Sequence, residues 1–434
     1  MTSFSRRGAC PALSAPMQTG DGHLVRLNPL ADEIAPKALI GLCESAQRHG
    51  NGIVEVTARG SIQIRGLTAE SACLLAAEVD VLGIPVRTGV PIDTSPLASI
   101  DPEEIANPAP LAAAIRLAIA EAGLATRLGP KVSVIVDGCG QIKLGAIMGD
   151  VRLVALNAER WRLSVGGDAA SARLVGEFGS DAARVATLGI LRSISELGRQ
   201  GRARDLRVGA GADESRFEQS RATSSSPIGI LPLADSRIAL GIALPFGSID
   251  ATTLIAFCRA ATDADAAGIR AAPGRSLLVM GLAPPAADTL IATAKTLGFV
   301  TSPSDPRIRI AACPGAPACA SGMIAARDVA AEIAADLGES LDPTLSLHVS
   351  GCAKGCAHPG PATLTIVGDE KGAVFVVGGT AKGLPAAYTA GYEAARGMGR
   401  LTKLLAQERK PDENAAACLA RLGAKRLAQA LAQE

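Results

Sequence analysis

Residues 39–67 read LIGLCESAQRHGNGIVEVTARGSIQIRGL, and residues 254–282 read LIAFCRAATDADAAGIRAAPGRSLLVMGL. The two stretches align without a gap at an offset of 215 residues. The residues of the first stretch that recur in the second are Leu39, Ile40, Cys43, Ala46, Ser61, Gly66 and Leu67. Such a long period indicates a duplicated pair of domains, because solenoid repeats are only about 20 to 50 residues long.

A second pairing at nearly the same offset extends the duplication along the chain. Residues 134–139 (VIVDGC) resemble residues 347–352 (LHVSGC), and residues 163–167 (LSVGG) resemble residues 375–379 (FVVGG). Two copies of one unit of about 215 residues therefore fill the chain. We expect a molecule with pseudo-twofold symmetry.

Each copy begins with alternating strands and helices, which predict half of a ferredoxin-like layer. The expected strands are His23–Leu27, Ile53–Ile64, Ile238–Leu244 and Arg270–Met280. The expected helices are Pro36–His49, Ala69–Leu82, Ala251–Ala261 and Pro285–Leu297. The second module of each copy opens with a long helix, Leu111–Ala122 or Ala326–Leu337, and continues with strands that end in the Gly-Cys and Gly-Gly turns.

The predicted fold class is α+β, with two ferredoxin-like half-domains and two α/β domains. The first half-domain is expected over residues 1–83 and the first α/β domain over 84–219. Residues 220–300 hold a linker, with the serine-rich stretch Ser220–Pro227, and the second half-domain, while residues 301–400 form the second α/β domain. Residues 401–434 form a helical tail whose last helix, Asn414–Gln433, has a packing or dimerisation role.

Composition narrows the classes of function. The chain has 434 residues, whereas a single hydrophobic core stops growing at roughly 250 to 300 residues. Two or more packed units are therefore expected. Lys and Arg (43) balance Asp and Glu (42) and aromatics make up 2%, so nucleic acid is not an expected partner.

The longest uncharged run, Ile310–Ala326, contains prolines and glycines, so no membrane span is expected. No apolar segment follows Arg6 and Arg7, and we expect a cytoplasmic protein without a targeting segment.

Four of the ten cysteines form two close pairs in the second copy, at residues 313–319 (CPGAPAC) and 352–356 (CAKGC). Without a secretory context, this number of cysteines favours metal or redox use over a disulfide framework. Four convergent thiolates suit zinc or an iron–sulfur cluster. The five residues between the first pair disfavour zinc, whose structural sites use gaps of about two to four. We predict a 4Fe–4S cluster held by Cys313, Cys319, Cys352 and Cys356.

The alternative is that these four are unrelated buried thiols. The first copy carries Cys139 opposite Cys352, Lys143 near the place of Cys356, and no counterpart of the first pair. Only the second copy is therefore equipped for a cluster. Buried, inert thiols are expected for the cysteines that lie among apolar residues at helix-like spacing. These are Cys43, Cys73, Cys258 and Cys418.

With these two pairs the chain resembles the nitrite and sulfite reductase family, which binds sirohaem beside a 4Fe–4S cluster through a C-x5-C and a C-x3-C pair. The similarity covers essentially the whole chain, including the twofold repeat. Residues 57–66 (TARGSIQIRG) look like the family's first loop for tetrapyrrole carboxylates. In the second copy, Arg270 and Arg275 take the matching place.

Other segments resemble the branch of this family that hydroxylates a precorrin in aerobic cobalamin biosynthesis. They are residues 7–11 (RGACP), 19–22 (TGDG), 25–26 (VR), 227–232 (PIGILP) and 352–359 (CAKGCAHP). Sirohaem enzymes carry further basic residues where this chain reads GVPIDTS at 89–95 and KVS at 131–133. The incomplete set favours a tetrapyrrole that is released as product over one that is kept as a cofactor.

The resemblance implies that molecular oxygen hydroxylates carbon 20 of precorrin-3A while the ring A acetate closes a γ-lactone. The cluster would carry electrons from NADH, delivered by a separate reductase or ferredoxin, because Gly209-Ala-Gly211 is not a dinucleotide fingerprint. Oxygen activation could use a mononuclear non-haem iron or the electron-rich substrate itself. The alternatives are a sirohaem-dependent nitrite or sulfite reductase, and an electron-transfer protein that keeps only the cluster.

A precorrin carries many flexible carboxylates, which guanidinium and ammonium groups bind well. The expected substrate-binding residues are Arg59, Gln63, Arg65, Lys131, Arg270 and Arg275. The family loops support Arg59 and Arg270, and any of the basic residues could instead be a solvated surface charge. The expected catalytic residues are Lys354 and His358. A proton donor, an iron ligand and a structural histidine all remain open for His358.

Overall fold

The computed structural model describes residues 11–28, 33–207, 227–338, 342, 344–358 and 360–432. The chain divides into two compact units. The first comprises Met1–Gln18, His23–Ile242 and Ile249–Leu297, and the second comprises Thr19–Gly22, Ala243–Ser248 and Gly298–Glu434. Residues 7–10 of the first motif, the Gly209–Gly211 segment, Pro359 and all of the serine-rich linker except Pro227 lie outside the described residues.

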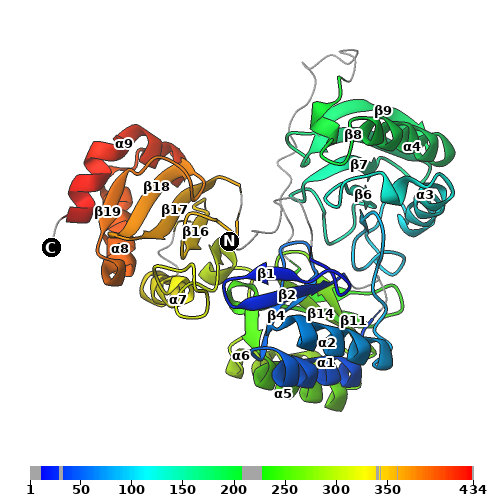
Figure 1. Ribbon diagram of the computed structural model, residues 1–434, viewed down its shortest axis with the longest axis horizontal. Helices are drawn as coiled ribbons and strands as arrows, with labels where there is room; N and C mark the ends of the chain where they lie inside the picture. Colours follow the sequence, from blue (N-terminus) through cyan, green and yellow to red (C-terminus); the bar gives the residue numbers. More distant parts are fainter. Residues whose placement is uncertain are drawn as a thin grey trace. The chain divides into compact units, whose positions relative to one another are not determined.

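The first half-domain, in the first unit, is a sheet with two helices that lie side by side (Figure 1). Its strand order is β1-β2-β4-β3-β12, in which β12 comes from the second copy. Helices α1 and α2 both contact β4 and cover its buried apolar side chains, such as Ile62 and Ile64. The elements are β1 (Met17–Thr19), β2 (Gly22–Leu27), α1 (Pro36–His49), β3 (Ile53–Val56), β4 (Ile62–Leu67), α2 (Ala69–Val81) and β12 (Ser248–Asp250).

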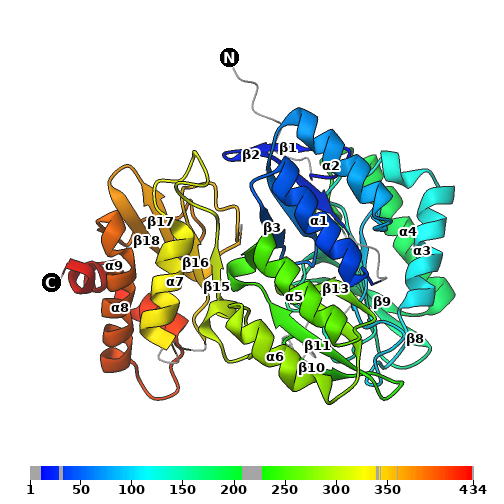
Figure 2. The same cartoon turned by 90° about the horizontal axis from the view of Figure 1, so that it is seen from below.

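The second half-domain repeats this arrangement, with strand order β10-β11-β14-β13. Its elements are β10 (Gly229–Pro232), β11 (Ile238–Ala243), α5 (Ala251–Asp263), β13 (Gly268–Ala272), β14 (Ser276–Leu282) and α6 (Ala286–Thr296). The Glu55–Gln63 pair of β3 and β4 recurs as the Arg270–Leu278 pair of β13 and β14, at the offset of 215 found in the sequence. Helices α1 and α5 pack against each other (Figure 2). The predicted duplication is confirmed at the level of single residues.

Two strands predicted as continuous are β-hairpins. The expected strand Ile53–Ile64 turns between β3 and β4, and Arg270–Met280 turns between β13 and β14. Gly60 (φ 84°) and Gly274 (φ 78°) take left-handed conformations in these turns, which glycine adopts without a steric penalty. The half-domains are therefore βαββα units. The predicted alternation of single strands and helices was wrong, because the turn glycines were read as part of one strand.

The first α/β domain contains a five-stranded sheet of order β5-β6-β7-β8-β9. Strands β5, β6 and β7 are parallel, whereas β8 and β9 are antiparallel to their neighbours. Its elements are β5 (Ile92–Asp93), α3 (Ala109–Glu121), β6 (Val134–Asp137), β7 (Gly149–Ala155), β8 (Arg160–Gly167), β9 (Arg173–Gly179) and α4 (Ser180–Glu196). Trp161 is the largest fully buried side chain and belongs to the core of this domain.

The second α/β domain, in the second unit, has the same topology with strand order β15-β16-β17-β18-β19. Val134 pairs with Val151 in the first domain as Leu347 pairs with Leu364 in the second. Its elements are β15 (Ile310–Ala312), α7 (Ala326–Leu337), β16 (Leu347–Ser350), β17 (Ala362–Asp369), β18 (Gly372–Gly379), β19 (Ala387–Thr389), α8 (Ala394–Glu408) and α9 (Ala415–Ala432). The two domains are therefore copies in fold and in register.

The C-terminal helices complete the second domain. Helix α8 follows the last strand as α4 does in the first domain, so the boundary expected between residues 400 and 401 lies inside a helix. Helix α9 has no counterpart among the described residues of the first copy, which end at residue 207. It contacts α8, β18 and β19 and buries Leu419 and Leu427. It therefore packs on its own domain. Among the helices of the described residues, none has the length and apolar character needed to cross a membrane.

Candidate cluster and substrate-binding site

The four predicted cluster ligands lie on two neighbouring loops of the second unit. Cys313 follows β15 directly, Cys319 lies in the same loop, and Cys352 and Cys356 lie in the loop after β16. Because β15 and β16 are adjacent and parallel, their carboxyl ends meet at one edge of the sheet. Cys313 is buried, Cys319 and Cys352 are half-buried, and Cys356 is exposed.

Glycines allow the two cysteine loops to pack backbone against backbone. A Cβ atom on Gly351 would lie 2.8 Å from the Cα of Gly315 and 3.3 Å from the Cα of Gly322. The Gly351 amide donates a hydrogen bond to Cys313 Sγ at 3.1 Å, and its carbonyl accepts one from the Met323 amide at 2.7 Å. Backbone amides that donate to thiolates are a common feature of iron–sulfur sites and tune their potentials.

The donor set fits a cluster of several irons. Within the residues that the structure describes, no three or more His, Cys, Asp or Glu side chains are close enough to hold one metal ion. A four-iron cluster is larger than one ion, and its thiolates stand farther apart. Four cysteines on two touching loops, with an amide donated to one sulfur, match the ligands and hydrogen bonds that such a cluster uses.

The two predicted catalytic residues lie in the second cysteine loop. Lys354 is exposed and donates to Ser321 Oγ at 2.8 Å, which joins the two cysteine loops. His358 is half-buried, and its Nε2 lies 3.2 Å from the Pro361 carbonyl oxygen. Its ring meets His348 edge to face, with centroids 5.7 Å apart. His348 is fully buried on β16. The sequence did not single it out as a site residue, because it lies within a strand whereas His358 lies in the loop that follows, ten residues later.

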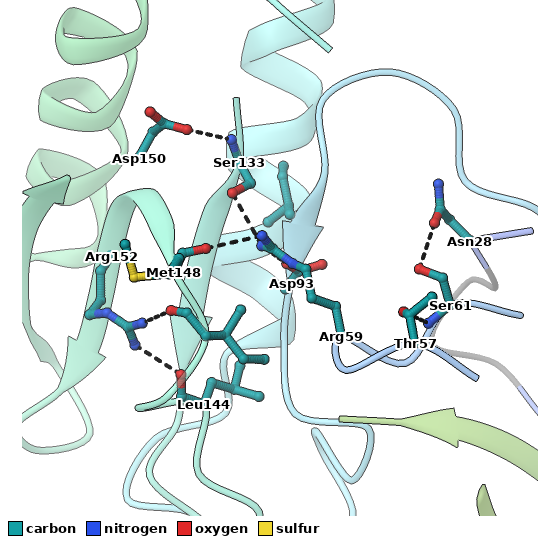
Figure 3. A network of polar contacts seen from close by, with 12 residues as sticks. Asn28, Thr57, Arg59, Ser61, Asp93, Ser133, Leu144, Met148, Asp150 and Arg152 are labelled. Carbon is teal, nitrogen blue, oxygen red and sulfur yellow. Dashed lines mark hydrogen bonds and ion pairs between the residues drawn. The ribbon is translucent and has the colours of Figure 1, made fainter. Parts of the chain in front are cut away.

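Arg59 lies in the β3–β4 turn and reaches the first α/β domain (Figure 3). Its guanidinium donates to Asp93 Oδ2 at 2.6 Å, to Ser133 Oγ at 3.2 Å and to the Met148 carbonyl at 3.0 Å. The side chain keeps 39% of its surface exposed. A carboxylate, a hydroxyl and a carbonyl oxygen thus surround a guanidinium that is still open to solvent.

The turn that carries Arg59 touches the matching turn of the second copy. The Gly274 amide donates to the Ala58 carbonyl at 3.0 Å, and a Cβ on Gly60 would lie 2.9 Å from the Ala272 carbonyl carbon. Arg275 lies in the second turn at φ 64°, where the first copy has Gly60. A residue other than glycine is strained in this left-handed backbone conformation, and such strained residues concentrate at functional sites. Burial lowers the pKa of Arg275.

Gln63 and Arg65 belong to a polar row across the first sheet. Arg26 donates to Gln63 Oε1 at 2.6 Å, Gln63 Nε2 donates to Glu55 Oε2 at 2.9 Å, and Arg65 pairs with the same oxygen at 3.3 Å. Arg26 was not among the predicted binding residues, although it contacts the predicted residue Gln63. The signal for it was its strand position, which places it opposite Gln63.

The two remaining basic candidates lie in other surroundings. Arg270 pairs with Glu33 at 2.9 Å and donates to the Pro96 carbonyl. Lys131 is exposed in the turn before β6. The structure therefore brings Arg59 and Arg275 onto touching turns and joins Gln63 to Arg65 through Glu55. Arg270 contacts Pro96, three residues after the Asp93 that Arg59 contacts, and Lys131 lies two residues before Ser133, which also accepts from Arg59.

Three of the four cysteines that were expected to be buried are buried. Cys43, Cys258 and Cys418 are buried, but Cys73 is exposed on α2, so the prediction of a buried thiol there was wrong. The apolar neighbours of Cys73 predicted burial wrongly, because α2 is rich in alanine and the side of this helix that carries Cys73 faces the solvent. Burial raises the pKa of Cys258 to about 12, which keeps this thiol protonated.

In the first copy, the loop that corresponds to the Cys352 loop lies among carboxylates. Cys139, the counterpart of Cys352, takes a left-handed conformation (φ 60°), and its amide donates to Asp137 Oδ1 at 2.9 Å. Burial, with the charge of Asp137, raises the pKa of the Cys139 thiol to about 11. The surroundings of this thiol therefore disfavour its thiolate form. Asp101 accepts the Gln141 amide at 2.8 Å in the same region.

The carboxyl group of Glu104, in this region, makes the stability of the folded chain depend on pH. Burial raises its pKa to about 7, the Ser99 amide opposes this, and Asp101 and Asp137 add to it. Because the folded pKa lies above the ordinary value of 4.5, the folded state holds a proton that the unfolded state releases. The resulting stability is full below about pH 4.5 and is lost as the pH rises through about 7. We expect Glu104→Gln to raise the thermal midpoint by about 2 to 4 °C at about pH 8.

The measurement is thermal unfolding of wild type and variant at several pH values between about 5 and 8. The exposed neighbour Glu103 provides the control, since Glu103→Gln leaves the pH profile unchanged. A wild-type profile retained in Glu104→Gln would contradict the assignment.

Comparison with known proteins agrees with the fold described above and assigns the chain to a family. The family described as nitrite/sulfite reductase ferredoxin-like half domain matches residues 15–81. A protein named precorrin-3B synthase, from Sinorhizobium sp, is 39% identical over 436 residues, which cover 99% of this chain and 95% of the relative. The chain belongs to the precorrin-3B synthase family. This membership confirms the resemblance found in the sequence and the predicted oxidoreductase class.

A solved structure supports the fold independently. The NirA protein of Mycobacterium tuberculosis aligns with a TM-score of 0.68 at 17% identity, over 93% of this chain and 84% of NirA. The predicted duplicated α+β fold of the nitrite and sulfite reductases is confirmed. Membership of this wider family suggests an iron–sulfur cluster.

Proposed function

We propose that the chain converts precorrin-3A to precorrin-3B, with oxygen-dependent hydroxylation at carbon 20 and closure of a γ-lactone by the ring A acetate. The observation that carries the proposal is the 39% identity to a precorrin-3B synthase along 99% of the chain. The incomplete set of basic residues at 89–95 and 131–133 also favours a tetrapyrrole substrate over a bound sirohaem. The reaction belongs to aerobic cobalamin biosynthesis, and we place it in the cytoplasm.

The reaction needs an external source of electrons. One atom of molecular oxygen enters the substrate and the other leaves as water, so each turnover consumes two electrons and two protons, which NADH supplies through a separate reductase or ferredoxin. Bound by Cys313, Cys319, Cys352 and Cys356, a 4Fe–4S cluster supplies one-electron transfer. A mononuclear non-haem iron is a further candidate cofactor for oxygen activation.

The basic residues bind and orient the substrate. Arg59 and Arg275, on touching turns, are the main carboxylate-binding pair, and the contact of Arg59 with Asp93 at 2.6 Å is the kind of bond that a substrate carboxylate would make. Arg65, Gln63, Arg270 and Lys131 hold further propionate and acetate groups. Lys354 and His358 are the candidate catalytic groups, because both lie in the loop of Cys352 and Cys356.

The alternative is a sirohaem-dependent nitrite or sulfite reductase. Anaerobically purified protein is expected to show a broad brown absorption shoulder without the intense bands of sirohaem. In a reconstituted system, precorrin-3A should take up one labelled atom from labelled molecular oxygen. Sirohaem bands would favour the reductase, and a product without label would exclude the oxygenase reaction.

A further inference from the structure

The turn Thr19–Gly22 belongs to the second unit, although the strands on either side of it belong to the first sheet. It lies on the loop that carries Cys319. The Gly20 carbonyl accepts a hydrogen bond from the Ala320 amide at 3.1 Å, one residue after the cysteine. Three hundred residues of sequence separate the two partners, so the contact is a feature of the tertiary fold.

Side-chain hydrogen bonds fix the shape of this turn. Thr19 Oγ1 lies 2.6 Å from Asp21 Oδ1 and 2.7 Å from the Gly22 carbonyl oxygen. Gly22 has a φ of 113°, which side chains rarely allow. The turn is therefore held by its own residues and presents Gly20 to the cysteine loop.

Gly20 is in contact with the sulfur of Cys319. A Cβ atom on Gly20 would lie 2.5 Å from Cys319 Sγ and 3.0 Å from the Ala320 amide nitrogen. Gly20 is absent from the residues with positive φ, so its backbone conformation is open to any amino acid. Glycine is required at this position by the space beside the sulfur.

We propose that the Thr19–Gly22 turn positions Cys319 as a cluster ligand by closing over its sulfur. The inference rests on the proposed cluster and adds a positioning residue from the first part of the chain. In the chain without iron, the thiol can rotate away from a methyl group at position 20. A thiolate bonded to iron cannot rotate, so the methyl group acts on cluster binding far more than on folding.

The test compares Gly20→Ala with Gly399→Ala, a control in α8 of the same unit where an added Cβ meets nothing within 4 Å. Three quantities are measured: the iron and sulfide content per chain, the rate at which a chelator removes the cluster, and the electron paramagnetic resonance spectrum of the reduced protein. We expect Gly20→Ala to lose its cluster about 10-fold faster, or more, since groups that orient metal ligands carry about 10- to 100-fold in affinity. Its reduced spectrum should also shift.

Thr19→Val provides a second variant, because it removes the hydroxyl that holds the turn and leaves Gly20 in place. It should lose the cluster faster than wild type but more slowly than Gly20→Ala. The thermal midpoints of the iron-free proteins should agree within a few degrees. Equal cluster retention and identical spectra in wild type and Gly20→Ala would overturn the positioning role. A wild-type protein that binds no cluster would overturn the proposed function itself.

Discussion

Cys352→Ser is expected to abolish both the cluster and the activity. Cys352 lies in the loop directly after β16, next to Gly351, whose amide donates to Cys313 Sγ. A serine hydroxyl is a hard, protonated group, whereas iron–sulfur clusters select soft thiolates. Iron and sulfide analysis and the visible spectrum of the anaerobic protein measure the first loss, and conversion of precorrin-3A measures the second.

Cys139→Ser is the matched control, because Cys139 has the same place in the first copy. Its thiol has a pKa raised to about 11 by burial, and we assign no metal to it. This variant should keep the wild-type iron content and activity. A complete cluster in Cys352→Ser, or its loss in Cys139→Ser, would show that the ligands have been assigned to the wrong residues.

Arg59→Ala is expected to weaken binding of precorrin-3A by about 10- to 150-fold, since a hydrogen bond to a charged group contributes about 1.5 to 3 kcal/mol. Arg59→Lys should lie between this variant and wild type, because an ammonium cannot form the paired contact of a guanidinium. Anaerobic titration with the substrate gives the dissociation constant. Iron content should not change, as Arg59 belongs to the first unit and the cysteines to the second.

Asp93→Asn tests the same site and is expected to have the opposite effect on the affinity for the substrate. Asp93 holds the Arg59 guanidinium at 2.6 Å, so it competes with a substrate carboxylate, and its removal should tighten binding. Arg48→Ala, at an exposed ion pair with Glu78, serves as the control with unchanged affinity. If Arg59→Ala lowers the thermal midpoint and leaves the dissociation constant unchanged, Arg59 holds only the hairpin turn to the α/β domain.

Local patterns in the sequence were sufficient for most elements. The expected helix bounds Pro36–His49 and Ala326–Leu337 agree with α1 and α7 to the residue, because helical periodicity and a proline or loop boundary are local properties. The hairpins were missed because their apolar residues continue on both sides of a short turn. In such a case only glycine at positive φ marks the reversal.

The sequence by itself determined the duplication, its offset and the two cysteine pairs, because repeated residues and ligand spacing can be counted along one chain. Only the tertiary structure decided which distant residues meet: Arg59 with Asp93, the Arg59 turn with the Arg275 turn, and His348 with His358. It also brought Gly20 against Cys319. Such contacts depend on how strands pair and loops pack, and no periodicity or spacing within one segment encodes them.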